Sequence, residues 1–233
     1  MAKIYTLNNK IITLDNKWAQ AKEEAPVDPY NPLGLPANTV RVRTSDGNVP
    51  VKETYTSYET ATLVEGTSDV YDVYKSGTTF QYLLLSSSNV VEVLGANTSN
   101  VTDMNNMFLN CQALTTVPLF DISNVTNTRW MFYNCISLTS VPLFDTSNVS
   151  NISCMFSFCT SLTTVPLLNT SSVTNMGGMF YGCTNIQSGA LALYQQASTQ
   201  TNPPTDHEQT FYNCGTNTTT GAAELAQIPS DWK

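Results

Sequence analysis

The sequence has few charged residues and almost no histidine. Asp, Glu, Lys and Arg together make up 12% of its 233 residues, about half the usual share, and His207 is the single histidine. General acid–base catalysis and metal binding both rely heavily on histidine, so we expect no enzyme, metal site or cofactor. The net charge of −8 also disfavours nucleic acid as a partner, because such a partner needs a basic surface.

Long apolar runs are missing too. No stretch approaches the ~20 apolar residues of a membrane span. At the N-terminus, Asn8, Asn9, Lys10 and Asp15 interrupt the region where the apolar run of a secretion signal would lie. We therefore expect neither a membrane span nor signal-directed export.

What the sequence does have is a repeat with a step of 24 residues. A fixed period of this size is typical of stacked units, because one unit alone cannot bury its apolar face. The recurring apolar positions include Val101, Val125, Val149 and Val173; Phe108, Phe132, Phe156 and Phe180; and Cys111, Cys135, Cys159 and Cys183.

Within one unit the spacing predicts a short helix followed by a short strand. Thr128, Met131, Phe132 and Cys135 stand at i, i+3, i+4 and i+7, which is the spacing of one helical face. Residues 138–143 hold apolar positions in alternation at Val141 and Leu143, which suggests a short strand. The expected fold is an α/β repeat solenoid, leucine-rich-repeat-like with a 24-residue period, with a small β cap and an N-terminal β-hairpin module.

The chain divides into four expected parts. Residues 1–21 read as a hairpin that serves as an attachment module, 22–36 as a proline-rich linker, 37–82 as a β cap domain, and 83–233 as the repeat solenoid with its C-terminal cap. A lone hairpin is marginally stable, so we expect it to dock on another protein. The candidate attachment residues are Ile4, Tyr5, Leu7, Ile11, Ile12, Leu14 and Trp18.

The cysteine column has more than one interpretation. A set of disulfides or a metal site is possible, but equivalent residues on the helical side of neighbouring units would be too far apart for a strain-free bridge. Free cysteine packs well as a small hydrophobic residue, so we expect a buried ladder. Cys154 stands outside the column, and the sequence leaves its pairing open.

Two polar groupings also have alternatives. Asp121, Asp145 and Asn169 form a column whose oxygen atoms could bind Ca²⁺, although side-chain turns explain the same residues better. His207 and Cys214 could be drawn as a catalytic pair, but the repeat already accounts for Cys214. We therefore expect turns in the first case and no catalysis in the second.

The stretch FDISNVTNTRWMFYNCISLTSVPLFDTSNVSNISCMF resembles the repeat of the BspA-like leucine-rich-repeat surface proteins, F-D-T-S-N-V-T-N-M-x-x-M-F-x-x-C-x-S-L. The resemblance covers roughly residues 80–220 and departs from the pattern at Leu168-Asn169, where the family has Phe-Asp. It implies an adhesin or another surface-exposed binding protein of bacteria. The N-terminal module and the closing segment also resemble proteins encoded by gut bacteriophages, which implies a virion protein.

Positions that vary between units suggest a binding surface. Arg129, Trp130, Tyr133 and Tyr181 occupy columns that face away from the expected core. Exposed aromatic rings of this kind suit contact with a sugar ring or a protein. Packing within the chain or against another subunit is an equally good explanation of the same residues.

The sequence therefore predicts a non-catalytic virion structural protein of the head or tail fibre or adhesin type. It would dock by its N-terminus on other virion proteins and display the repeats at the virion surface, where they would bind a host-surface glycan or protein. The alternatives are a bacterial cell-surface adhesin and a purely structural capsid or tail decoration protein. The oligomeric state stays open, with a trimer suggested only by analogy to fibre proteins.

Overall fold

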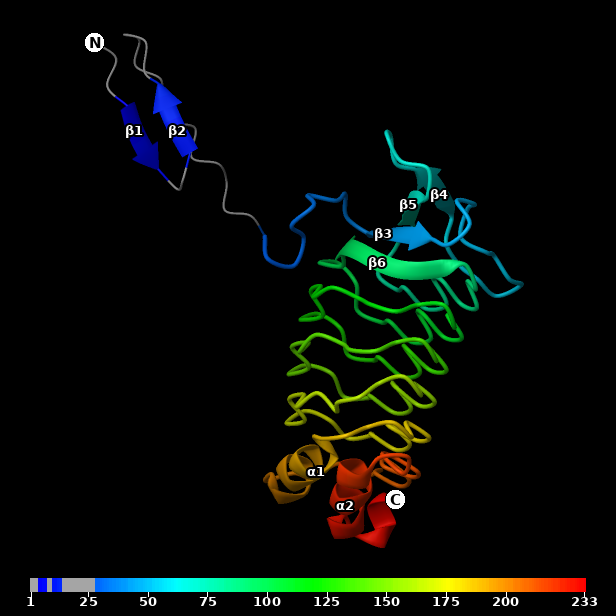
Figure 1. Ribbon diagram of the computed structural model, residues 1–233, viewed down its shortest axis with the longest axis vertical. Coiled ribbons are helices and arrows are strands. Elements are labelled where there is room, and N and C mark those ends of the chain that lie inside the picture. The colour runs from blue at the N-terminus through cyan, green and yellow to red at the C-terminus, as the bar shows by residue number, and fades with distance from the viewer. Residues whose placement is uncertain (1–3, 8–9, 14–27) are drawn as a thin grey trace.

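The computed structural model describes residues 4–7, 10–13 and 28–233 (Figure 1). In chain order the elements are β1 (Ile4–Leu7), β2 (Lys10–Thr13), β3 (Thr39–Thr44), β4 (Thr60–Leu63), β5 (Val70–Tyr74), β6 (Val90–Asn97), α1 (Ala190–Thr199), α2 (Thr219–Gln227) and a final 3₁₀ turn, η1 (Ser230–Trp232).

The strands β1 and β2 form an antiparallel pair, with Ile4 opposite Thr13 and Leu7 opposite Lys10. This pair lies where the sequence predicted the attachment hairpin. Of the candidate attachment residues, Leu14 and Trp18 lie outside the described part of the chain. The others fall on the two strands, namely Ile4, Tyr5, Leu7, Ile11 and Ile12.

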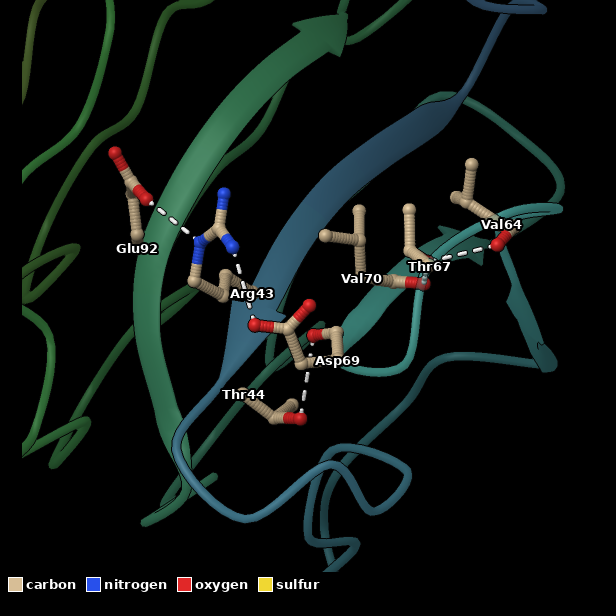
Figure 2. A network of polar contacts seen from close by, with 7 residues as sticks. All are labelled: Arg43, Thr44, Val64, Thr67, Asp69, Val70 and Glu92. Atoms are coloured by element: carbon tan, nitrogen blue, oxygen red, sulfur yellow. Dashed lines mark hydrogen bonds and ion pairs between the residues drawn. The ribbon is translucent and has the colours of Figure 1, made fainter.

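A second, four-stranded antiparallel sheet has the order β4-β5-β3-β6. One face buries Val40, Val42 and Val73 completely. The other face carries ion pairs, and Figure 2 shows Arg43 of β3 lying between Asp69 and Glu92 at 3.1 Å from each. Arg43 therefore links β3 to Glu92 of β6 and to Asp69, which directly precedes β5, although exposed ion pairs contribute little to stability.

The predicted α/β leucine-rich-repeat-like solenoid is wrong. Regular structure among the described residues is limited to the small antiparallel sheet, the β1–β2 pair and short helices near the C-terminus. Residues 98–189, which hold the 24-residue repeats, contain neither an α-helix nor a strand. They consist of turns and isolated bridges, and we call them the turn region.

Two features of the backbone exclude the helix that was predicted at 128–135. Trp130 and Asn134 have φ angles of 57° and 58°, in the left-handed region that a right-handed helix does not contain. The amides of Phe132 and Asn134 donate to the carbonyls of Met155 and Ser157, 23 residues further along the chain in each case, at 2.9 and 2.8 Å. A helix would need those amides for bonds four residues back.

Hydrogen bonds of this kind join each turn to the equivalent turn in the following unit. Isolated parallel bridges connect Asp103 with Asn127, Asn127 with Asn151, and Asn151 with Asn175. In Figure 1 the turns between β6 and α1 accordingly lie in layers. The strand predicted at 138–143 is absent, because these residues make no ladder of bridges to the next unit.

The core of the turn region is a row of phenylalanine rings. Phe108, Phe132, Phe156 and Phe180 are fully buried, and their ring centroids follow one another at 5.3, 5.6 and 5.4 Å with the rings nearly parallel. At the C-terminal end, Phe211 continues the row at 6.1 Å from Phe180. The row thus extends from the sheet end to the helices α1 and α2.

Candidate binding site

The structure brings three of the four candidate surface residues into one groove. Arg129, Tyr133 and Tyr181 line an open groove of about 570 Å³ on the side of the turn region. Trp130 lies beside it, where with Leu109 and Tyr133 it lines an adjoining hollow of about 260 Å³. Tyr133 therefore belongs to both depressions and connects all four residues.

The groove has an aromatic lining built from successive layers. The rings of Tyr133 and Phe158 meet edge to face at 5.5 Å, and those of Phe158 and Tyr181 at 5.2 Å. Tyr181 then stacks on Tyr212 at 4.8 Å. Edge-to-face packing holds aromatic rings in fixed orientations, so we describe Tyr133, Phe158 and Tyr181 as a preformed aromatic strip.

The charges of the groove are separated along its length. Arg129 lies at one end, with its guanidinium 3.9 Å from the centre of the Trp130 ring. The exposed carboxylates of Asp206 and Glu208 lie at the other end, and Asp206 accepts a hydrogen bond of 2.7 Å from the Asn175 side chain. The groove therefore offers one cation, a hydrophobic middle and two anions.

Three main-chain amides along the groove donate hydrogen bonds between layers. The amide of Trp130 donates to the carbonyl of Ser153, that of Cys154 to Gly177 and that of Gly178 to Glu208, at 2.9–3.1 Å. Addition of a β-strand through the main chain, the mode used by many peptide-binding proteins, would have to displace these bonds between layers, so recognition of a ligand by side chains is favoured.

Sequence reasoning missed Phe158, Asp206 and Glu208. Ser157 is the residue that stands 24 positions from both Tyr133 and Tyr181, and Phe158 follows it by one position. A comparison of residues exactly 24 positions apart therefore does not group Phe158 with the two tyrosines. The two acids belong to the last layer, where the step lengthens to 31 residues, as the bridge from Asn175 to Asp206 shows. The same step of 31 residues separates Phe180 from Phe211. Applying this step to Asn175 would have placed Asp206 in the last layer.

The cysteine column is a buried ladder, as predicted. Cys111, Cys135, Cys159 and Cys183 are completely buried, Cys214 is 1% exposed, and all six cysteines are free thiols. Each thiol of the first four donates to a carbonyl of the preceding layer, for example Cys135 to Phe108 at 3.1 Å. Cys154 differs, because it is only half-buried and lines the groove.

The acidic column forms side-chain turns, which confirms that prediction. The carboxylate of Asp145 accepts the amide of Ser147 at 3.1 Å, and hydrogen bonding to Ser147 lowers the pKa of Asp145. Asp121 and Asn169 accept equivalent amides at 2.8 and 3.0 Å. His207, in contrast, stacks its ring on Trp232 at 4.2 Å, so its observed role is packing at the C-terminal end.

The buried thiols predict a selective modification. Burial raises the pKa of Cys111, Cys159 and Cys214 to about 12, so these groups carry no reactive thiolate at neutral pH. With an aromatic disulfide reagent at pH 8, we expect one rapidly reacting thiol in the folded chain, Cys154, and six after denaturation. Two or more fast thiols in the folded chain would contradict the burial described here.

The same pKa shifts set a pH dependence of stability. Below the ordinary thiol pKa of about 8.5, both folded and unfolded chains keep their thiol protons and these groups add no pH dependence. Between about 8.5 and about 12, the unfolded chain releases protons that the folded chain retains. The free energy of unfolding should therefore fall with rising pH in this window, and urea titrations at pH 8 and pH 10 measure it.

The layered turns and the sheet at one end define a repeat-containing protein whose groove is assembled from neighbouring repeats. The family model described as "Mycoplasma protein of unknown function, DUF285" matches residues 77–194. Because this is just over half of the chain, the chain belongs to that family. The match is loosely consistent with the BspA-like resemblance.

The search of curated proteins and the search of solved structures gave no match. The family match includes the Arg129 end of the groove and the whole aromatic strip, whereas Asp206 and Glu208 lie beyond it. Among the residues that the structure describes, no helix has the length and apolar character needed to cross a membrane.

Proposed function

We propose that this chain is a non-catalytic binding protein that works at a surface and holds its ligand in the groove between Arg129 and Glu208. The observation that carries the proposal is the aromatic strip of Tyr133, Phe158 and Tyr181, whose rings line an open groove and fix one another's orientation. Rigid aromatic side chains give a large contact area at little entropic cost, and such residues dominate binding energies.

We further propose that the chain is a virion component of the head or tail fibre type, which docks by its N-terminal strands on the particle and binds the host through the groove. The resemblance of the terminal segments to proteins encoded by gut bacteriophages supports this virion role. In a fibre, many copies would act together, and multivalency turns weak single contacts into firm attachment.

A bacterial cell-surface protein is the second candidate, and the family match favours it because that family is described from Mycoplasma. Immunogold electron microscopy with an antibody against the purified chain separates the two. Label on phage particles supports the virion role, and label on intact uninfected cells supports the bacterial one.

The binding function itself is tested with the variant Tyr181→Ser. Tyr181 lines the groove, and truncation of a central interface aromatic typically weakens binding by 2 kcal/mol or more, which is about thirtyfold. We expect a loss of that size when the purified, fluorescently labelled full-length chain is titrated onto cells of the bacterium that hosts the phage.

The matched control is Tyr55→Ser, which removes an equally large ring that is 74% exposed and lies outside the groove. Both variants are first compared with the parent chain by circular dichroism and thermal unfolding, so that misfolded protein is excluded. Equal cell binding by Tyr181→Ser and Tyr55→Ser would show that the groove is not the binding surface.

A further inference from the structure

The groove contains the one cation of a long acidic stretch. Arg129 is the only lysine or arginine between Lys75 and Lys233. Its side chain is exposed, and among the described residues no ion pair joins it to a carboxylate. An unpaired arginine at the end of an aromatic groove is suited to bind an anionic group of a ligand, because its planar fork matches a carboxylate.

We propose that the ligand of this groove is an acidic glycan, a sugar chain that carries a carboxylate, with that carboxylate on Arg129 and sugar rings on Tyr133 and the rest of the aromatic strip. This inference rests on the proposed binding function and adds the chemical class of the ligand. It assigns Arg129 as the residue that selects acidic over neutral sugars.

Trp130 supports the placement of Arg129. In the column to which Trp130 belongs, the other layers have Asn106, Cys154 and Gly178, and all four residues have φ between 52° and 63°. Glycine and asparagine adopt this left-handed conformation readily, whereas a bulky tryptophan is strained in it. Backbone strain of this kind is concentrated at functional sites, and here the side chain of the strained residue lies directly against the Arg129 guanidinium, which is 3.9 Å from the centre of its ring.

The opposite end of the groove distinguishes a sugar from an acidic peptide. Asp206 and Glu208 are exposed there, and they would repel the repeated carboxylates of an acidic peptide. Sugar hydroxyls, in contrast, donate hydrogen bonds, and carboxylates are good acceptors of such bonds. A chain with a carboxylate at the Arg129 end and hydroxyls at the Asp206 end therefore matches both charges of the groove.

The length of the groove fits a short oligosaccharide. From Arg129 the layers continue through Ser153 and Gly177 to Glu208, which all line the groove. If each step equals the spacing of hydrogen-bonded strands, about 4.8 Å, the groove spans roughly 14 Å. This is longer than one sugar ring, so more than one ring contacts the aromatic strip at the same time.

The test uses a glycan array that pairs oligosaccharides containing uronic or sialic acid with the same compounds after methyl esterification of their carboxylates. Esterification removes the negative charge and keeps the rings and hydroxyls. We expect the full-length chain to bind members of the acidic set, to lose about tenfold or more of its affinity for the esterified forms, and to bind more weakly as salt is raised.

Two substitutions at one position give the matched comparison. Arg129→Gln removes the cation and should reduce binding to the acidic glycans to the level of their esters, while Arg129→Lys keeps the charge and should retain part of the affinity. Neither change removes a core contact, because Arg129 is exposed, and thermal unfolding checks that both variants fold.

Equal binding of acidic and esterified glycans, binding unaffected by Arg129→Gln, or binding to a polyglutamate peptide in place of any glycan would each overturn the proposal. These outcomes are distinct from failure of the proposed function. If Tyr181→Ser abolishes cell binding and Arg129→Gln does not, the groove is the binding surface and the acidic-glycan assignment is wrong. If neither variant changes cell binding, the binding function of the groove is wrong as well.

Discussion

Replacing Phe156 with alanine is expected to lower the free energy of unfolding by about 3–5 kcal/mol, the range measured for large aromatic truncations in cores. Phe156 is fully buried, and its ring lies between those of Phe132 and Phe180, at 5.6 and 5.4 Å. The neighbouring layers are held by hydrogen bonds to one another, for example from the amide of Phe156 to the carbonyl of Met179 at 2.9 Å. They therefore cannot collapse fully into the cavity.

The control is Leu143→Ala, which truncates an apolar side chain that is 63% exposed in the same turn region. We expect a change of about 0.5 kcal/mol or less for this exposed site. Urea denaturation followed by circular dichroism measures both variants. Similar values for Phe156→Ala and Leu143→Ala would mean that the phenylalanine row is not the core of the turn region.

Gly221→Ala is expected to destabilise the chain although glycine lies in the helix α2. Replacing helical glycine with alanine normally stabilises by about 0.5–1 kcal/mol. Here a Cβ atom would clash with the carbonyl oxygen of Ile186 and would lie 2.6 Å from the hydroxyl of Thr218. That hydroxyl accepts the Gly221 amide at 3.0 Å as the N-terminal cap of α2, so the new methyl group would displace both the cap and the packing.

We expect the net loss to reach about 1–3 kcal/mol, as for other overpacked sites, measured as a lower midpoint of urea unfolding. Ala223→Gly is the matched control, because Ala223 is exposed on the same helix and the reverse exchange there should cost only about 1 kcal/mol through helix propensity. A stabilising effect of Gly221→Ala would show that α2 does not contact Ile186 as described.

The repeat columns predicted burial correctly and backbone conformation wrongly. Phe132 and Cys135 are buried as their spacing indicated, since a period reports which side chains face the core. The period does not determine the backbone conformation of the residues between those side chains. The left-handed residues Trp130 and Asn134 and the hydrogen bonds to the next unit replace the expected helix, and such contacts between distant residues leave no local pattern in the sequence.

The Arg129 end of the candidate site and two rings of its aromatic strip were predictable, whereas the middle ring of the strip and the acidic end were not. The sequence identified Arg129, Tyr133 and Tyr181 because they occupy columns that vary between units and face away from the expected core. The structure places all three along one groove. Phe158 and Asp206 were missed, because the first is shifted by one residue and the second follows the longer last step of the repeat. Their positions depend on how the layers turn, which is a property of the fold.

The central claim, that the groove is the binding surface, is tested most directly by blocking it through Cys154. This thiol lines the groove, and the other five are buried, so a bulky polyethylene glycol maleimide should attach to the folded chain at Cys154 alone. We predict that the labelled chain no longer binds host cells, while Cys154→Ser treated with the same reagent binds like the untreated parent chain. Undiminished binding by the labelled chain would contradict the account.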